Sequence, residues 1–145
     1  MSNDIVKEMN LLLADEMVFY QKLRNFHWNV RGPAFFQLHT KFEEMYTASS
    51  LTVDQIAERI RALGGRPLST MKEFLDSSRI SEQSDVPSAN HMVGELQSDL
   101  EKLVEFTNGL RKSAGNAGDD TTVALMDDLA DAHEQDAWML KAWLG

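Results

Sequence analysis

Residues 25–61 read NFHWNVRGPAFFQLHTKFEEMYTASSLTVDQIAERIR. The pair Gly32-Pro33 separates two segments whose apolar residues have helical spacing, so we expect two helices that lie antiparallel across a tight turn. His27 and His39 are each six residues from Pro33. Across such a hairpin the two histidines stand at the same height, close enough for their side chains to share one ion.

The composition is that of a globular protein without cysteine chemistry. The 145 residues are enough for one domain with a full hydrophobic core, and 43% of them are hydrophobic. The chain contains no cysteine, which excludes disulfides, thiolate zinc sites and cysteine nucleophiles. Any metal site must therefore use histidine nitrogen and carboxylate oxygen. The formal net charge of −9 disfavours general affinity for nucleic acid and favours cations as ligands.

The sequence carries no signal for a membrane or for secretion. No apolar run approaches the ~20 residues that a membrane-spanning helix needs. The first residues, Met-Ser-Asn-Asp, lack the basic and apolar regions of a signal peptide. We therefore expect a cytoplasmic protein that does not bind a membrane.

Four long helices and one long connection are predicted. Apolar residues three and four apart predict helices over about residues 2–30, 35–63, 88–115 and 119–145, with Trp143 facing inward in the last one. The connection over residues 66–87 is too long for a simple hairpin and should cross the bundle. Within it, Thr70-Met-Lys-Glu73 is a capping-box pattern that predicts a short helix. The prediction is an all-α fold, a ferritin-like four-helix bundle forming a single domain over residues 1–145.

The second helix carries two pairs of potential metal ligands. His39 and Glu43 are four residues apart, so their side chains meet on one helix face. Asp54 and Glu58 have the same spacing, and two acids so placed repel each other unless a cation lies between them. Glu43 and Asp54 are separated by roughly 16 Å along the helix axis. Metal–oxygen bonds of about 2.0–2.2 Å cannot bridge that distance within one chain.

Two copies of this helix packed antiparallel about a two-fold axis would bring the two pairs together. An axis within Ala48-Ser49 places His39 level with Glu58 of the second copy, and Glu43 level with its Asp54. Small residues at the axis would let the helices approach closely, and a second apolar stripe on the first helix also predicts a neighbouring chain. Each site would take His27, His39 and Glu43 from one chain and Asp54 and Glu58 from the other.

Two imidazoles and three carboxylates suit Fe(II), with Mn, Co and Zn as competitors by ligand type. A site at an interface with open coordination positions fits redox or hydrolytic chemistry better than a closed structural site.

Simpler interpretations exist for single residues. A histidine without ligand-spaced company, such as His91 or His133, is typical of a hydrogen-bonded core residue. Glu58 alone could pair with Arg61, as on many solvated helix faces.

These residues resemble the motifs of the Dps family, the mini-ferritins or DNA-binding proteins from starved cells. The matching motifs are His27-Trp28-Asn-Val-x-Gly32-Pro33, Leu38-His39-x-x-Phe42-Glu43 and Asp54-x-x-Ala57-Glu58-Arg59. The resemblance covers nearly the whole chain. It implies a hollow homododecamer that acts as a ferroxidase, oxidising Fe(II) at two-fold interfaces, preferentially with hydrogen peroxide, and that stores ferric iron and protects against oxidative damage.

The resemblance also implies residue roles. Family members use the residues that match His27, His39, Glu43, Asp54 and Glu58 as ferroxidase ligands, some with Asp where Glu43 stands. Trp28 matches a tryptophan that lies beside the iron and accepts oxidising equivalents, although Trp28 and Tyr46 are also explained as packing residues. Asp120 matches the region of the acidic pores through which iron enters at three-fold axes. Acids at a helix start are also explained by the helix dipole.

Members that bind DNA carry a tail rich in Lys or Arg, usually before the first helix. Here the first twenty residues contain a single basic residue, Lys7. Phosphate binding needs clustered cations, so we expect weak DNA binding or none. The alternative function is a nucleoid-compacting protein whose ferroxidase activity is secondary. A third possible function is that of a cage or bundle with only a structural role.

Overall fold

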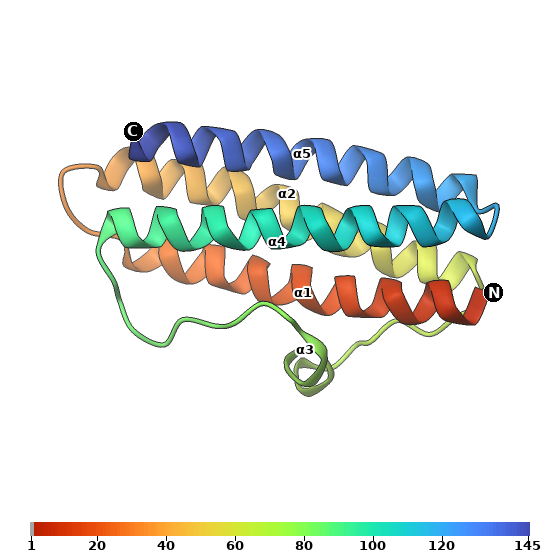
Figure 1. The fold of residues 1–145 in the computed structure, drawn as a ribbon. Helices are drawn as coiled ribbons and strands as arrows, with labels where there is room; N and C mark the ends of the chain where they lie inside the picture. Colours follow the sequence, from red (N-terminus) through yellow and green to blue (C-terminus); the bar gives the residue numbers. More distant parts are fainter. Residues whose placement is uncertain (1) are drawn as a thin grey trace.

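A computed structural model describes residues 2–145, and these residues form five helices (Figure 1). Four long helices lie side by side: α1 (Ser2–Asn29), α2 (Phe35–Ala62), α4 (Ala89–Asn116) and α5 (Asp120–Leu144). The short helix α3 (Met71–Ser77) lies outside this bundle, beside α1, in the long connection from α2 to α4 (Figure 1). The predicted all-α, ferritin-like bundle with a short crossover helix is confirmed.

The helix boundaries follow from local sequence. The turn between α1 and α2 contains Gly32 with φ of 110°, a left-handed conformation that favours glycine. Thr70 and Glu73 form the predicted capping box at the start of α3. Ser88 accepts a hydrogen bond from the backbone N–H of His91 at the start of α4, and Asp119 caps α5 in the same way.

The core lies between two antiparallel helix pairs. The helix α1 packs along α2, α4 packs along α5, and α1 also contacts α4. The largest fully buried side chains come from α1, α2 and α4, and include Phe19, Phe26, Phe42, Ile56, Ile60, Leu96 and Leu100. Within residues 2–145, none of the helices has the length and apolar character needed to cross a bilayer.

Two predictions about burial are wrong. Trp143 is 42% exposed, because it lies in the last turn of α5 and borders an open groove between α5 and the start of α2. His91 is exposed in the first turn of α4, where only its backbone N–H makes a capping hydrogen bond. Neither residue belongs to the predicted metal centre.

The crossover is fastened to α1 by a buried carboxylate. Asp15 is fully buried and accepts hydrogen bonds from the backbone N–H, Nε and Nη2 of Arg79, at 2.5, 3.0 and 2.6 Å. The Arg79 guanidinium also lies 3.7 Å from the ring centroid of Phe106 on α4. Burial raises the pKa of Asp15, although the hydrogen bonds and charge of Arg79 act in the opposite direction. This contact joins α1, the crossover and α4 at one point.

Candidate metal centre

The hairpin between α1 and α2 brings His27 and His39 together as predicted. The Nδ1 atom of His27 lies 2.7 Å from the backbone oxygen of His39, and the Nδ1 atom of His39 lies 2.7 Å from the backbone oxygen of His27. The two imidazole rings are stacked, with centroids 3.8 Å apart and an interplanar angle of 12°. The other face of the His39 ring stacks on Phe35 at 4.8 Å. The two imidazoles are therefore held by backbone bonds and by ring packing.

These hydrogen bonds decide which nitrogen of each ring carries the proton. A backbone carbonyl oxygen can only accept a hydrogen bond, so both Nδ1 atoms must be protonated and donate. In the neutral rings both Nε2 atoms then present a free lone pair. A ring that donates Nδ1–H to a carbonyl and offers Nε2 is the usual arrangement of a metal-binding histidine.

Glu43 supplies the first carboxylate of this centre. Its Oε1 atom lies 3.7 Å from Nε2 of His27, and its side chain is 59% exposed. Two lone-pair donors that face each other at this separation repel unless a cation or a proton lies between them. One metal ion with bonds of about 2.0–2.2 Å can reach both atoms. The chemistry of this donor pair therefore fits a metal ion.

Asp54 and Glu58 are exposed on α2, away from the histidines along the helix. In the described part of the chain neither carboxylate has an ion-pair or hydrogen-bond partner. The alternative pairing of Glu58 with Arg61 is not formed, since Arg61 donates a hydrogen bond to the backbone oxygen of Gly65 instead. No group of three or more His, Asp or Glu side chains within residues 2–145 could hold a metal ion. Within one chain, Asp54 and Glu58 therefore do not join the other predicted ligands, and the complete ligand set stays a prediction.

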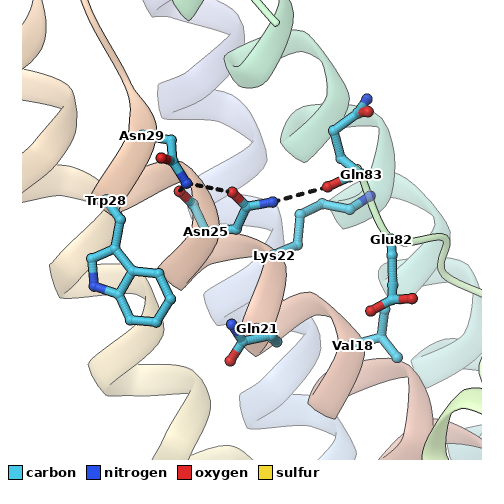
Figure 2. A pocket seen from close by; sticks show the side chains of 8 residues that line it. All are labelled: Val18, Gln21, Lys22, Asn25, Trp28, Asn29, Glu82 and Gln83. Atoms are coloured by element: carbon cyan, nitrogen blue, oxygen red, sulfur yellow. Dashed lines mark hydrogen bonds between the residues drawn. The ribbon is translucent and has the colours of Figure 1, made fainter. Parts of the chain in front are cut away.

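Trp28 follows His27 at the end of α1 and is 57% exposed. It borders a pocket of about 280 Å³ between α1 and the crossover, with its indole on the side away from Gln83 (Figure 2). Across this pocket Asn25 donates a 3.0 Å hydrogen bond to the backbone oxygen of Gln83. The guanidinium of Arg24 lies 5.1 Å from the Trp28 ring centroid. The end of α1 is thereby tied to the crossover.

His133 lies in the core as predicted, and its hydrogen-bond partner is Glu16. Both side chains are buried between α1 and α5, with Nε2 of His133 bonded to Oε1 of Glu16. Burial lowers the pKa of His133, but the charge and hydrogen bond of Glu16, together with the charge of Asp136, act in the opposite direction, and the net shift of the pKa is upward. The sequence offers one signal for this pair, because Glu16 is an acid within the apolar stripe of the first predicted helix. This pair lies apart from the histidines of the candidate centre.

Asp120 is exposed in the first turn of α5. The capping role at this helix belongs to its neighbour Asp119, which accepts a hydrogen bond from the backbone N–H of Thr122 and pairs with Arg59 at 2.8 Å. Asp120 is therefore not needed to cap α5. Its assignment to a pore requires other copies of the chain and stays a prediction.

Known proteins resemble this chain over its full length. The model of the Ferritin-like domain family matches residues 6–145. A DNA protection during starvation protein 2 from Bacillus anthracis is 44% identical over 99% of both chains. The crystal structure of Dps from Staphylococcus aureus has a TM-score of 0.96 at 42% identity, covering 99% of this chain and 96% of that one. A Dps protein from Vibrio cholerae O1, described as a member of the ferritin-like diiron-carboxylate proteins, has a TM-score of 0.97 at 38% identity, covering 99% and 91%.

Proposed function

This chain belongs to the Dps family of ferritin-like proteins, and we propose that it is a ferroxidase whose sites are shared between two copies of the chain. Iron is the substrate of this reaction and also the stored product. Membership of the family supports a role in iron-related protection. Beyond that role, we propose which residues form the site, which oxidant it uses and how the copies assemble.

The observation that carries the proposal is the reciprocal hydrogen bonding of His27 and His39. This bonding leaves one free Nε2 lone pair on each of the two stacked rings, and the Nε2 atom of His27 lies beside the Glu43 carboxylate. Asp54 and Glu58 lie further along α2 with no partner in the described chain. A two-fold axis near Ala48-Ser49 would complete each site with these two acids from a second copy.

The donor set suits the oxidation of Fe(II). Imidazole nitrogens bind Fe(II), while carboxylate oxygens are hard anionic donors that stabilise the Fe(III) that forms. In the proposed reaction two Fe(II) ions each give one electron to hydrogen peroxide, which takes up two protons and becomes two water molecules. Because both electrons arrive together, no hydroxyl radical is released. Removing peroxide is then as much the function as storing iron.

We further propose that the copies form a homododecameric cage in the cytoplasm that stores ferric iron. Asp120 would belong to an acidic pore for iron, because it is exposed and free of a capping role at α5. Replacing Asp120 by Asn should slow iron uptake while leaving the ligands at α1 and α2 unchanged. Equal uptake rates in the variant and the parent protein would contradict the pore.

A nucleoid-compacting role is the second candidate, since relatives are named for DNA protection. The net charge of −9 argues against it. Basic side chains are also engaged by acids of the same chain, as in the pairs of Lys22 with Asp99 and Lys41 with Asp136. We therefore propose that any DNA binding is weak.

The test is rapid oxidation of Fe(II) by hydrogen peroxide, followed by the absorbance of the ferric product. The double variant His27→Ala, His39→Ala should lose the fast reaction while light scattering shows that the assembly persists. The matched control is His91→Ala, which removes an exposed histidine that lies outside the site. Fast oxidation by the double variant would refute the site.

A further inference from the structure

We propose that the centre of the four-helix bundle holds one bound water molecule, which joins the Glu16 carboxylate of α1 to the Thr107 hydroxyl of α4. Both side chains are fully buried. Glu16 lies eleven residues before His27, roughly 16 Å along α1 from the histidine pair. The water site is therefore separate from the candidate metal centre and does not depend on the proposed function.

Glu16 and Thr107 each have an enclosed oxygen atom without a hydrogen-bond partner. Oε1 of Glu16 is bonded to Nε2 of His133, but Oε2 has no partner within residues 2–145, and neither has Oγ1 of Thr107. In the described part of the chain, only these two enclosed side-chain oxygens lack a partner. A polar group buried without a hydrogen bond costs free energy, so such groups are nearly always paired with protein or with ordered water. One ligand can serve both oxygens if the two side chains lie close together.

Two contacts between α1 and α4 fix the register of these helices, which run in opposite directions (Figure 1). Lys22 of α1 bonds to Asp99 of α4 at 2.7 Å. Seven residues before Lys22 on α1, Asp15 bonds to Arg79, and the same guanidinium lies over Phe106, seven residues after Asp99 on α4. Each step back along α1 is therefore matched by one step forward along α4.

This register places Glu16 and Thr107 at nearly the same height in the bundle. Thr107 lies two residues beyond the position level with Glu16, which is roughly 3 Å along the helix axis. A helical side chain leans toward the start of its own helix, so the Thr107 hydroxyl leans toward the height of Glu16. The helix α5 agrees independently, because the 3.5 Å pair of Arg111 and Asp127 places His133 level with the same position on α4.

The chemistry of this site fits water better than a metal ion. Water can donate one hydrogen bond to Oε2 of Glu16 and share another with the Thr107 hydroxyl. Glu16 and His133 are the only metal-binding side chain types in the cluster, and they are already bonded to each other. Within residues 2–145 no group of three or more such side chains could hold a metal ion. The raised pKa of His133 favours the imidazolium, which balances the charge of Glu16, so a neutral ligand is expected.

The direct test is a crystal structure of the assembled protein at a resolution that shows individual waters in the core. We expect a peak of electron density about 2.5–3.0 Å from both Oε2 of Glu16 and Oγ1 of Thr107. Absence of this peak, or a peak that reaches only one of the two oxygens, would overturn the proposal. A peak with distances of about 2.0–2.2 Å would identify a metal ion instead of water and would overturn it as well.

Two variants of Thr107 give a second test in solution. Thr107→Val keeps the shape of the side chain and removes the hydroxyl. If this hydroxyl had no partner, its removal would relieve a cost and raise the midpoint of thermal unfolding. With a bridging water the hydroxyl is paired, so we expect Thr107→Val to lower the midpoint. A midpoint equal to or above that of the parent protein would contradict the bridge. Thr107→Ser is the matched control, because it keeps the hydroxyl, and its crystal structure should retain the water peak.

Discussion

His27 and His39 each donate an Nδ1 hydrogen bond of 2.7 Å to the backbone carbonyl oxygen of the other residue. The pair joins the last turn of α1 to the first turns of α2, so the geometry of the hairpin and the orientation of both rings are set by the same two bonds. Each ring is left with one lone pair, on Nε2. The two bonds that connect the helices therefore also leave a free nitrogen lone pair on each of the two proposed metal ligands.

Removing the two distant acids should disable the iron site without disturbing the fold. Asp54→Asn with Glu58→Gln keeps side-chain size but removes two anionic ligands, and we expect Fe(II) oxidation to slow by at least about 10–100-fold. Stopped-flow absorbance of the ferric product measures this rate. Glu44→Gln is the control, because Glu44 is an exposed acid of the same helix that lies outside the ligand set. Equal losses in both variants would mean that only the general negative charge matters.

The pair of Glu16 and His133 should make stability depend on pH. The pKa of His133 is raised above its ordinary value of 6.5 in the folded protein, because the charge and hydrogen bond of Glu16 and the charge of Asp136 together outweigh the effect of burial. The folded state thus holds this proton more tightly than the unfolded state, so the pair stabilises fully below pH 6.5 and loses its contribution as pH rises through the folded pKa. Thermal midpoints measured across this range should fall in the parent protein and fall less in His133→Gln.

His91→Gln is the control for this pH series, since His91 is an exposed histidine on α4. Its midpoints should follow those of the parent protein. If His133→Gln and the parent gave parallel curves, the buried pair would not be the source of the dependence.

The buried contact of Asp15 with Arg79 should contribute measurably to stability. Asp15→Ala removes the acceptor of three Arg79 hydrogen bonds, and we expect a loss of about 1.5–3 kcal/mol in the free energy of unfolding. Denaturant unfolding followed by circular dichroism measures it. Asp4→Ala, at an exposed position of the same helix, should have almost no effect. A similar small effect of Asp15→Ala would show that the crossover is held by other contacts.

DNA should not be retained by this protein. With a net charge of −9, the chain lacks the excess of cations that phosphate binding requires. Gel retardation of plasmid at low salt and neutral pH should show no shift at protein concentrations that saturate iron oxidation. A clear shift that disappears as salt increases would favour the nucleoid-compacting alternative.

The sequence predicted what depends on periodicity and local pairing. The helix bounds, the capping box at Thr70 and the meeting of His27 with His39 all follow from spacings within a few turns. The reciprocal ring-to-carbonyl bonds were not predicted, because they depend on ring orientations that spacing does not determine. Trp143 was placed inward by periodicity alone, yet the last turn of a helix has fewer neighbours to cover it.

Contacts between distant segments also escaped prediction. Asp15 and Arg79 are 64 residues apart, and nothing near Arg79 marks it as the partner of a buried acid. His133 was predicted to have a core partner, but Glu16 could be identified only once α1 and α5 were placed side by side. The alignment of Asp54 and Glu58 with the histidines of a second copy stays a prediction from symmetry.

The central claim is that each site draws its ligands from two chains, and co-assembly of two inactive variants tests it most directly. One variant carries His27→Ala and His39→Ala, and the other carries Asp54→Asn and Glu58→Gln. In a pair made of one copy of each variant, one site lacks all four of the replaced ligands, and the other site keeps all four. Random pairing in equal amounts makes half of the pairs mixed, so fast Fe(II) oxidation should return to about a quarter of the parent level. Co-assembled variants that stay as inactive as either variant alone would contradict the shared site.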